Sequence, residues 1–519
     1  MSRWATPLNG AARRGRDRRA RVLTPRPGRP RVSGEPPSVA VIGGGIAGLA
    51  AATGLAERGV AVTLYERDHQ LGGRLAGWPV ELADGSRATM SRGFHAFFRQ
   101  YYNLRGLLRR VDPGLAMLTG LPDYPLRHSG GLQDSFARVP RTPPWSALGF
   151  VALSPTFGWR DLAAMNPRAA LPLLDVRVPE VYERFDGVSA RELLDRIRFP
   201  RAADHLAFEV FSRSFFADPR ELSAAELVLM FHIYFLGSSE GLLFDVPDEP
   251  FPTALWEPLG RYLTSHGVDV RTGQAVESVR PDGDGSLVVT GDGAERHDGV
   301  VLALDTGGLQ GVVSRSPLLG DERWRARVQG LRTTPPFLVT RVWLDRRVAA
   351  DRPGFLGTSG YGPLDNVSVL ERWEGEAARW SARTGGSVVE LHAYAVDPDA
   401  DHATEQDGLL AQLRRVYPET GDARIVDVRH EWRSDCPLFA VGGHRDRPGV
   451  RTPDPTVTLA GDLVRTELPV ALMERAATTG FLAANAQLER WGVRGQTLWT
   501  VPAEGRVRAL RALNRLAGV

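Results

Sequence analysis

The sequence has no lysine and very little cysteine. All 64 basic residues among its 519 positions are arginine, and the single cysteine is Cys436. The lack of lysine excludes Schiff-base catalysis and leaves general-base chemistry to histidine, aspartate, glutamate or tyrosine. A single cysteine cannot form an internal disulfide, which fits a reducing compartment. His430 and Cys436 do not have the spacing of a zinc site, and no metal site is predicted.

Long apolar runs are also absent. No stretch of about twenty apolar residues without charge occurs, so the sequence predicts no membrane-spanning helix. The composition, 43% hydrophobic and 24% charged, is typical of a globular protein. The length suggests two or three domains. Together these features predict a cytoplasmic protein.

The net charge of +3 is unevenly distributed along the chain. Residues 1–38 contain ten arginines and two acids, a net charge of +8, which leaves −5 for the remainder. We interpret residues 1–37, which are also rich in proline and glycine, as a disordered basic leader. Such a tail can bind anionic lipid or nucleic acid, but a solvated tail is the simpler interpretation, and no nucleic-acid partner is predicted.

A glycine-rich turn follows an apolar run at residues 39–42. Gly43, Gly45 and Gly48 have the spacing G-x-G-x-x-G of dinucleotide-binding folds. Gly43 allows the tight turn, and Gly45 lets the backbone approach a pyrophosphate. Gly48 lets the following helix lie close to the strand.

The residues after this turn complete a strand–helix–strand unit. Ile46 and Ala47 open a helix predicted over residues 46–58, and its free amide groups and dipole face the phosphates. A second apolar strand over residues 60–65 delivers Glu66. An acid at this place accepts hydrogen bonds from the adenosine ribose hydroxyls. The order of these parts predicts a Rossmann-type dinucleotide-binding unit.

A second glycine turn follows the acid. Arg67 comes directly after Glu66, and Gly72, Gly73 and Arg74 offer another close backbone approach to a phosphate, with a guanidinium to pair the charge. With the first turn, this motif resembles the flavin-binding amine oxidase and carotenoid desaturase superfamily. The resemblance implies FAD as cofactor. It also implies an α/β fold with a three-layer, Rossmann-type FAD-binding domain around a parallel sheet and an inserted α+β substrate domain, as in amine oxidases and phytoene desaturases.

Two later segments extend this resemblance. Val276 occupies the position whose backbone pairs with adenine in the superfamily. Gly461 and Asp462 end an apolar strand, where the glycine lets the backbone close on the pyrophosphate and the aspartate accepts a ribitol hydroxyl bond. Met473 lies near the start of a small-residue helix over residues 469–487, whose positive end favours the anionic reduced flavin. No second G-x-G-x-x-G follows a strand, so no separate NAD(P) domain is predicted.

Residues 93–103, GFHAFFRQYYN, are aromatic and basic around His95. A histidine among aromatic residues is more often a packed core residue than a catalyst. The segment nevertheless resembles the actinobacterial carotenoid aryl-ring (φ-ring) synthases, β-carotene desaturase/methyltransferases that make isorenieratene. The likeness continues through residues 122–127 and 141–145. It implies that β-carotene is the substrate and that this segment borders the flavin ring.

The predicted organisation alternates between two domains. The predicted segments are a basic disordered leader (1–37), FAD-binding segments (38–110, 251–310 and 441–500), a helical substrate-domain insertion (111–250), a second substrate-domain segment (311–440) and a basic amphipathic C-terminal helix (501–519). The aromatic cluster of Phe208, Phe211, Phe215 and Phe216 is either core or the wall of a hydrocarbon tunnel. The C-terminal helix either packs on the body or lies on a membrane surface.

The predicted reaction oxidises the β-ionone rings of β-carotene by hydride transfer to flavin. Making each ring aromatic removes four hydrogens and moves one geminal methyl group to the neighbouring carbon. Apolar walls and aromatic faces suit the cation that this reaction forms, and one base must remove a proton. The candidate acid/base residues are His95, Glu431, Asp435 and Glu467, each equally open to a structural role. The predicted partners are the carotenoid, a quinone or oxygen as electron acceptor, and the cell-membrane surface, with the protein peripheral to it.

Three other functions remain open from the sequence. The chain fits a related carotenoid desaturase or isomerase that leaves the ring unchanged, or an amine or porphyrinogen oxidase with a more polar pocket. It also fits a prenyl-lipid chaperone of the GDP-dissociation-inhibitor type, which shares the fold without flavin. Flavin absorbance of the purified protein separates the chaperone from the enzymes.

Overall fold

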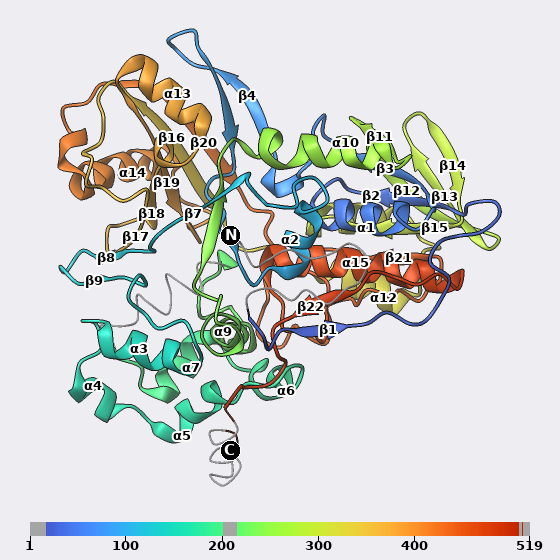
Figure 1. The fold of residues 1–519 in the computed structure, drawn as a ribbon, viewed down its shortest axis with the longest axis horizontal. Coiled ribbons are helices and arrows are strands. Elements are labelled where there is room, and N and C mark those ends of the chain that lie inside the picture. Colours follow the sequence, from blue (N-terminus) through green and yellow to red (C-terminus); the bar gives the residue numbers. More distant parts are fainter. Residues whose placement is uncertain (1–16, 201–214, 508–510, 512–519) are drawn as a thin grey trace.

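A parallel sheet forms the centre of one half of the molecule in the computed structural model, which describes residues 17–200, 215–507 and 511 (Figure 1). Its strands, in spatial order, are β11 (Asp269–Thr272), β3 (Ala61–Glu66), β2 (Ser38–Ile42), β15 (Gly299–Leu302) and β21 (Val457–Leu459). All neighbouring pairs in this sheet are parallel. Short apolar runs suit such strands because a parallel sheet is covered on both faces.

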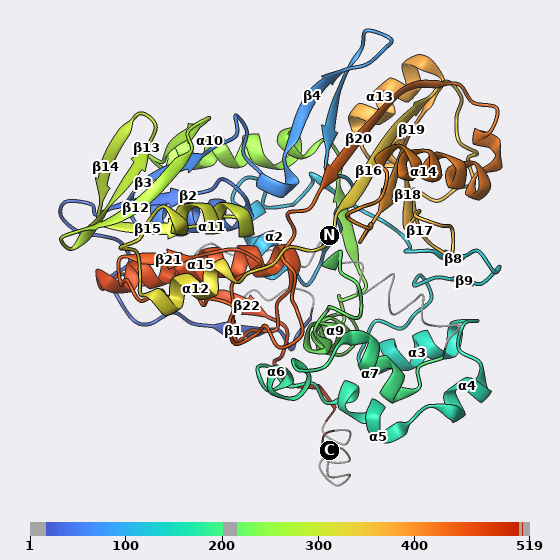
Figure 2. The same ribbon diagram turned by 180° about the vertical axis from the view of Figure 1, so that it is seen from behind.

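Two layers cover this sheet, one on each face. On one side lie α1 (Ile46–Ala56), α2 (Tyr102–Leu108), α10 (Glu257–Ser265) and α15 (Leu472–Arg490). On the other lie the antiparallel strands β12 (Val276–Asp282), β13 (Gly285–Thr290) and β14 (Gly293–His297) with α11 (Thr306–Ser314) and α12 (Glu322–Gln329), seen from behind in Figure 2. Alternate residues of β2 divide between the two cores, because successive side chains on a strand point to opposite faces. The predicted three-layer Rossmann-type fold is confirmed.

Helices α1 and α15 pack closely because both are rich in small residues. A Cβ atom at Gly480 of α15 would lie 2.2 Å from the carbonyl oxygen of Ala47 in α1. A Cβ atom at Gly54 of α1 would lie 2.9 Å from that of Ala484. This contact places the first turns of the two helices at the same end of the sheet, where the glycine-rich loop lies.

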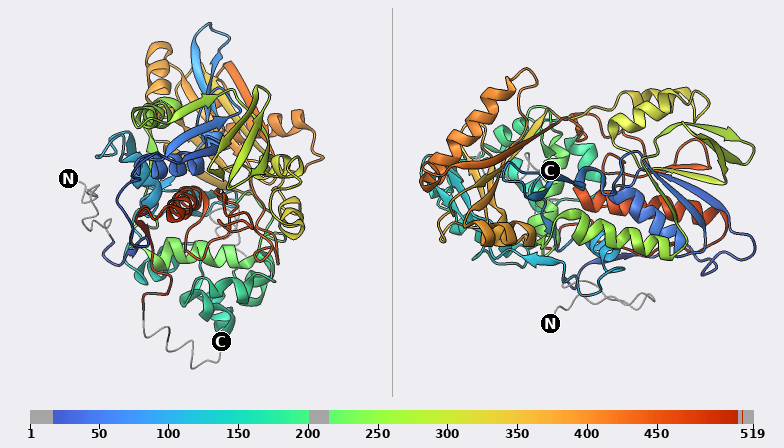
Figure 3. Two further views of the ribbon diagram at one scale, coloured as in Figure 1. Left: turned by 90° about the vertical axis from the view of Figure 1, so that its right-hand side faces the viewer. Right: turned by 90° about the horizontal axis from the view of Figure 1, so that it is seen from above.

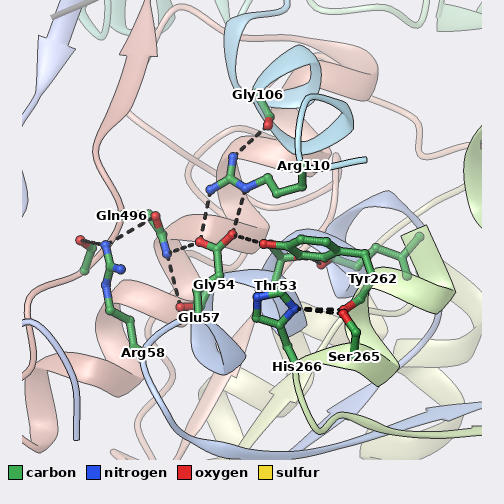
Figure 4. Close-up of polar contacts among 12 residues, drawn as sticks. Thr53, Gly54, Glu57, Arg58, Gly106, Arg110, Tyr262, Ser265, His266 and Gln496 are labelled. Carbon is green, nitrogen blue, oxygen red and sulfur yellow. Dashed lines mark hydrogen bonds and ion pairs between the residues drawn. The ribbon is translucent and has the colours of Figure 1, made fainter. Parts of the chain in front are cut away.

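A partly buried carboxylate ties the end of α1 to its neighbours (Figure 4). Glu57 accepts hydrogen bonds from Arg110 Nε at 3.0 Å, from Tyr262 Oη of α10 at 2.7 Å and from Gln496 Nε2 at 2.9 Å. The Arg110 guanidinium, just after α2, also donates to the Gly106 carbonyl. Burial alone would raise the pKa of Glu57, but Arg110 and Tyr262 hold it below its usual range. The cluster joins four segments that are distant in sequence.

The other half of the molecule contains a mixed sheet of seven strands. In spatial order these are β20 (Ile425–Arg433), β16 (Phe337–Leu344), β19 (Ser387–Ala393), β18 (Asn366–Val369), β17 (Phe355–Ser359), β8 (Leu126–His128) and β9 (Gln133–Asp134). It is accompanied by α13 (Gly375–Thr384), α14 (His402–Val416) and the hairpin of β4 (Gly77–Glu81) and β5 (Arg87–Ser91). Figure 3 shows this sheet at one end of the long axis and β12–β14 at the other.

A helical region completes the second half. It comprises α3 (Trp145–Leu153), α4 (Trp159–Ala164), α5 (Pro167–Ala170), α6 (Glu180–Phe185), α7 (Ala190–Ile197) and α9 (Ala224–Phe231). Between this region and the sheets lie the antiparallel strands β6 (Phe97–Phe98), β10 (Phe244–Pro247) and β7 (Leu118–Gly120). The core of the helical region includes Tyr102 of α2 and Leu126 of β8, so this region contacts elements of both halves.

Two of the predicted segments need correction. Residues 17–37 are not disordered, because β1 (Arg21–Leu23) pairs with β22 (Leu498–Thr500), far along the chain. The boundary predicted at residue 310 cuts through α11, which packs on the flavin-type sheet together with α12. Several predicted features lie outside the described residues. They are the first part of the leader (1–16), Phe208 and Phe211 of the aromatic cluster, and residues 508–510 and 512–519 of the predicted C-terminal helix.

Candidate active site and flavin groove

One cavity of about 620 Å³ runs from the carboxyl ends of β2 and β3 to the seven-stranded sheet. The predicted FAD-contacting residues that line it are Gly43, Gly45, Ile46, Ala47, Glu66, Arg67, Gly72, Gly73, Arg74, Val276, Gly461, Asp462 and Met473. Gly48 stands behind the cavity wall. A Cβ atom there would lie 1.8 Å from the Gly43 carbonyl oxygen, so glycine is required for helix α1 to approach the turn.

The first glycine turn forms a cradle without side chains. Gly43 has a φ of +107°, and a Cβ atom on it would lie 2.4 Å from the Ala303 carbonyl oxygen. Gly45 is the N-cap residue of α1 and forms a bridge with Gly72 of the second turn. The backbone amides of the first turn of α1 have no partner within the helix. This bare, amide-rich surface suits a pyrophosphate.

Glu66 ends β3 at the edge of the cradle. Its carboxylate accepts the Gly44 N–H at 2.6 Å and the Asp68 N–H at 2.9 Å. Burial raises the pKa of Glu66, and these two backbone donors oppose the rise. Each carboxylate oxygen can accept a further hydrogen bond, so Glu66 can hold the glycine turn and still receive ribose hydroxyls.

The second and third FAD-binding segments meet through an ion pair. Arg74 Nη2 lies 2.5 Å from Asp462 Oδ1, and both side chains line the cavity. Burial would lower the pKa of Arg74, but Asp462 raises it above its usual value. Gly461, with a φ of +146°, donates its N–H to Thr479 Oγ1 of α15. Arg74, which is predicted to contact a phosphate, and Asp462, which is predicted to bind a ribitol hydroxyl, are therefore partners in one ion pair.

These residues fit FAD. The groove combines a glycine cradle, a buried acid at the ribose position, an arginine–aspartate pair and the start of α15 at Met473. Its two ends suit the two halves of FAD, since the adenine end is bordered by Val276 and the other end opens onto the substrate cavity.

Aromatic rings line the substrate end of the cavity. They are Phe94, Phe98, Tyr101, Tyr124, Phe136, Phe216, Tyr234, Phe244, Phe337, Phe355 and Tyr394. Several are in direct contact: the Phe94 and Phe355 rings are 4.3 Å apart, and Tyr124 stacks on Phe355 at 4.8 Å. A long apolar wall of this kind suits a conjugated hydrocarbon, because flat rings offer both buried area and π-faces.

His95 lies on this wall beside the edge of the Phe251 ring. Its Nδ1–H donates to the Gly93 carbonyl at 2.9 Å, which leaves Nε2 as the acceptor nitrogen. Burial lowers the pKa of His95 to about 4, so the ring is neutral at physiological pH. Of the four candidate acid/base residues, His95 is the one whose side chain reaches the cavity.

The other three candidates need correction. Glu431 on β20 pairs with Arg433 at 2.5 Å and does not line the cavity. Asp435 pairs with Arg92, and it is Arg92 that reaches the cavity wall. Glu467 is exposed on the segment before α15. The sequence offers these acids as residues able to act as a base, but their side chains do not line the cavity.

Sequence reasoning missed a polar group on the cavity wall. Tyr394 and Asn366 line the cavity, and His392 and Glu390 lie behind them. Glu390, His392 and Tyr394 are spaced two apart at the end of β19, so they share one face of the strand. The spacing of these three polar residues in the sequence was the signal that could have identified this polar group.

Fold and groove together define a flavin-dependent oxidoreductase. The chain belongs to the family described as flavin containing amine oxidoreductase, whose profile matches residues 46–488. It is 74% identical over 506 residues to a Streptomyces griseus protein named carotenoid phi-ring synthase, covering 97% of this chain and 98% of that protein. A Chlorobaculum tepidum protein of the same name is 30% identical over 597 residues, covering 91% of each chain.

Solved structures show the same fold. Wild-type putrescine oxidase bound to putrescine matches 88% of this chain and 100% of its own, with a TM-score of 0.65 at 17% identity. The family confirms the predicted FAD cofactor and the oxidoreductase class. Within the described residues, no helix is both long and apolar enough to cross a membrane. Nor does this part of the chain contain a group of three or more His, Cys, Asp or Glu residues arranged to hold a metal ion.

Proposed function

We propose that this protein converts the β-ionone rings of β-carotene into aromatic rings, with a 1,2-shift of one methyl group. The observation that carries the proposal is the aromatic cavity that continues directly from the flavin groove. The name of the relative that is 74% identical supports the same reaction class. The resemblance of residues 93–103 to aryl-ring synthases points to the same substrate, and Phe94, His95 and Phe98 of that segment line the cavity.

The chain's own residues perform three tasks in this reaction. FAD, when bound, supplies the oxidising capacity for the two hydrides that each ring loses. The apolar walls around Phe94 and Phe355 keep water from the ring, so a cation formed there is not hydrated. The π-faces of the same rings attract the positive charge. A base on the wall must then remove two protons from each ring to complete the aromatic system.

Product analysis in cells that accumulate β-carotene tests this function. We expect expression of the chain to yield aryl carotenoids, detected by chromatography and by their absorption spectrum. The Glu66→Ala variant, with a weakened FAD site, is the matched control and should yield less product. Unchanged β-carotene, with folded wild-type protein that holds FAD, would contradict the proposal. New double bonds in an acyclic carotenoid, or oxidation of an amine, would favour the alternative oxidases.

We further propose that the protein lies on the cell-membrane surface and draws its substrate from it. Four large apolar side chains on α3 and α4 are exposed: Trp145 (62%), Leu148 (53%), Leu153 (54%) and Trp159 (74%). The guanidinium of Arg160 lies over the Trp159 ring, a pairing suited to an anionic lipid interface. Figure 1 shows both helices at the outer edge of the helical region.

The other side of α3 faces the cavity. Phe150 of α3 stacks on Phe136 at 4.7 Å, and Phe136 lines the cavity. Helix α3 thus stands between the exposed apolar surface and the aromatic wall, which supports passage of a hydrocarbon from membrane to site. A membrane position also favours a quinone as electron acceptor, with oxygen as the alternative. Reoxidation of substrate-reduced enzyme by a quinone in the absence of oxygen tests this choice.

A further inference from the structure

Five residues on or directly beside three strands of the seven-stranded sheet form a polar cluster that ends on the cavity wall. In the strand register, Arg341 of β16 is opposite Glu390 of β19, and Asn366 of β18 is opposite His392. Tyr394 follows β19 on the same face. The order of contacts runs from the cavity inward: Tyr394, His392, Glu390 and then Arg341.

The distances make this cluster continuous. Tyr394 Oη lies 2.6 Å from His392 Nδ1, and His392 Nε2 lies 3.0 Å from Glu390 Oε1. Arg341 holds the other carboxylate oxygen, Oε2, through Nε at 3.0 Å and Nη2 at 2.7 Å. The amide of Asn366 donates to Tyr394 Oη at 2.9 Å. His392, Glu390 and Arg341 are all almost completely buried.

The carboxylate decides the direction of these hydrogen bonds. Burial would raise the pKa of Glu390, but Arg341 and His392 hold it at about 2, so Glu390 is ionised and accepts only. His392 therefore carries its proton on Nε2 and donates it to Glu390. The Phe94 N–H also points at Nε2, but at the longer distance of 3.3 Å. With Nε2 protonated, Nδ1 of the neutral ring is the acceptor for the Tyr394 hydroxyl proton.

We propose that Tyr394 is the base that removes protons from the carotenoid ring. His392 and Glu390 are the positioning residues: His392 receives the phenol proton of Tyr394, and Glu390 stabilises the imidazolium that results. This inference rests on the proposed function. In each proton removal the ring C–H bond breaks and its electron pair forms the new ring double bond, which neutralises the cation. The proton moves to Tyr394 Oη as the phenol proton moves to His392 Nδ1. FAD, when bound, would supply the oxidising capacity for the hydride lost before each proton removal, so electrons and protons balance.

This arrangement accepts a proton at lower cost than His95 does. His95 is hydrogen-bonded to a backbone carbonyl, and protonating it would place a cation in an apolar wall. A protonated His392 would instead lie between Tyr394 and the ionised Glu390. The logic resembles that of hydrolytic triads, in which an acid stabilises the imidazolium while a hydroxyl faces the substrate.

A second, smaller cavity offers the proton a way out. It has a volume of about 30 Å³, enough for a water molecule, and its lining includes Glu390, Arg341, Glu374 and His95. Burial raises the pKa of Glu374 to about 7, although Arg341 opposes the rise. Glu374 can therefore exchange a proton near neutral pH. Such exchange returns His392 to its neutral form before the second proton of a ring is removed.

Steady-state kinetics of the FAD-loaded protein on β-carotene in lipid vesicles test the role of Tyr394. The Tyr394→Phe variant should keep its FAD content and its KM, while kcat falls by at least ~100-fold, the scale of general-base catalysis. The matched control is Tyr361→Phe, which removes a buried phenol hydroxyl from the same sheet region, outside the cavity lining. This control should keep wild-type kcat. An unchanged kcat in Tyr394→Phe, or a raised KM alone, overturns the proposal.

Chemical rescue tests the role of His392. The His392→Ala variant should lose activity to a similar extent, and added imidazole should restore part of kcat. Pyrazole has the same shape but is a much weaker base, so it should not restore activity. Equal rescue by both molecules would show that His392 only fills space and would overturn the relay. If His392→Ala does not retain FAD, the Tyr394→Phe result decides.

The geometry can be measured without turnover. We expect a strongly downfield imidazole N–H signal in the proton NMR spectrum of the wild-type protein, absent in His392→Ala and shifted upfield in Glu390→Gln. A missing signal in the wild type would contradict the His392–Glu390 bond. Failure of the wild-type protein to convert β-carotene would instead overturn the proposed function and the base role that rests on it. The two failures are thus distinguishable.

Discussion

A buried carboxylate between two arginines joins the helical region to the flavin-binding domain. Glu226 of α9 pairs with Arg475 of α15 and with Arg447, both at 2.7 Å, and accepts the Tyr182 hydroxyl at 3.2 Å. Arg475 also donates from Nε to the Val470 carbonyl at 3.0 Å, in the segment that leads into α15. The cluster therefore stabilises both the contact between the domains and the loop that shapes the flavin groove.

The change Glu226→Gln removes the charge and keeps the size of the side chain. Burial would raise the pKa of Glu226, but Arg475 and Arg447 lower it from the ordinary 4.5 to about 2. That difference corresponds to about 3 kcal/mol of folding free energy at neutral pH. Breaking one partner of a buried ion pair costs about 3–5 kcal/mol in other proteins. We therefore expect the free energy of unfolding to fall by about 3 kcal/mol, with faster loss of FAD.

The pH dependence follows from the same pKa. Because the pKa of Glu226 is lower in the folded protein than in the unfolded chain, its contribution is fully present above the unfolded pKa. It is lost as the pH falls from about 4.5 to about 2, where the carboxyl group becomes protonated. The stability difference between the wild type and Glu226→Gln should therefore be largest at neutral pH and should shrink in acid.

Urea unfolding followed by tryptophan fluorescence, with flavin release measured in parallel, checks this prediction. The matched control is Glu249→Gln, because Glu249 pairs with Arg379 at the surface, with side chains 29% and 64% exposed. Surface pairs contribute about 0–1 kcal/mol, so this variant should change stability little. A loss in Glu226→Gln no larger than in Glu249→Gln would refute the reasoning.

Two further predictions concern the cofactor groove and the membrane surface. The Glu66→Ala variant removes the acceptor for the Gly44 N–H and the predicted acceptor for the ribose hydroxyls of FAD, so FAD should dissociate more readily in flavin-fluorescence titrations. Full FAD occupancy at wild-type affinity would contradict this predicted role. A double variant, Trp145→Ser with Trp159→Ser, should co-sediment less with anionic vesicles yet keep its FAD. The control Leu318→Ser changes another exposed apolar residue (70% exposed) outside α3 and α4, and an equal loss in both would argue against a specific docking surface.

The flavin groove could be predicted well because its parts are local. Gly43, Gly45 and Gly48 are needed for the turn and for close helix packing whatever the surrounding fold, and Glu66 follows directly from the next strand. These backbone constraints involve only a few neighbouring residues, so the sequence pattern predicts them directly. The candidate bases were less predictable. Glu431 and Glu467 have the residue type of a base, but the packing of β20 and of the loop before α15 places them outside the cavity lining.

The sequence by itself determined the cofactor class, the three-layer fold and the aromatic character of the substrate region, because glycine spacing, apolar runs and ring content are properties of short segments. Only the tertiary structure decided which polar groups meet. Strand alternation places Glu390, His392 and Tyr394 on one face, but the sheet register brings Arg341 opposite Glu390 and Asn366 opposite His392. Packing between segments that are distant in sequence sets that register. Such packing costs chain entropy, and the burial of side chains between the segments offsets this cost. The cofactor site could therefore be predicted from the sequence, whereas the proposed base could be identified only from the tertiary structure.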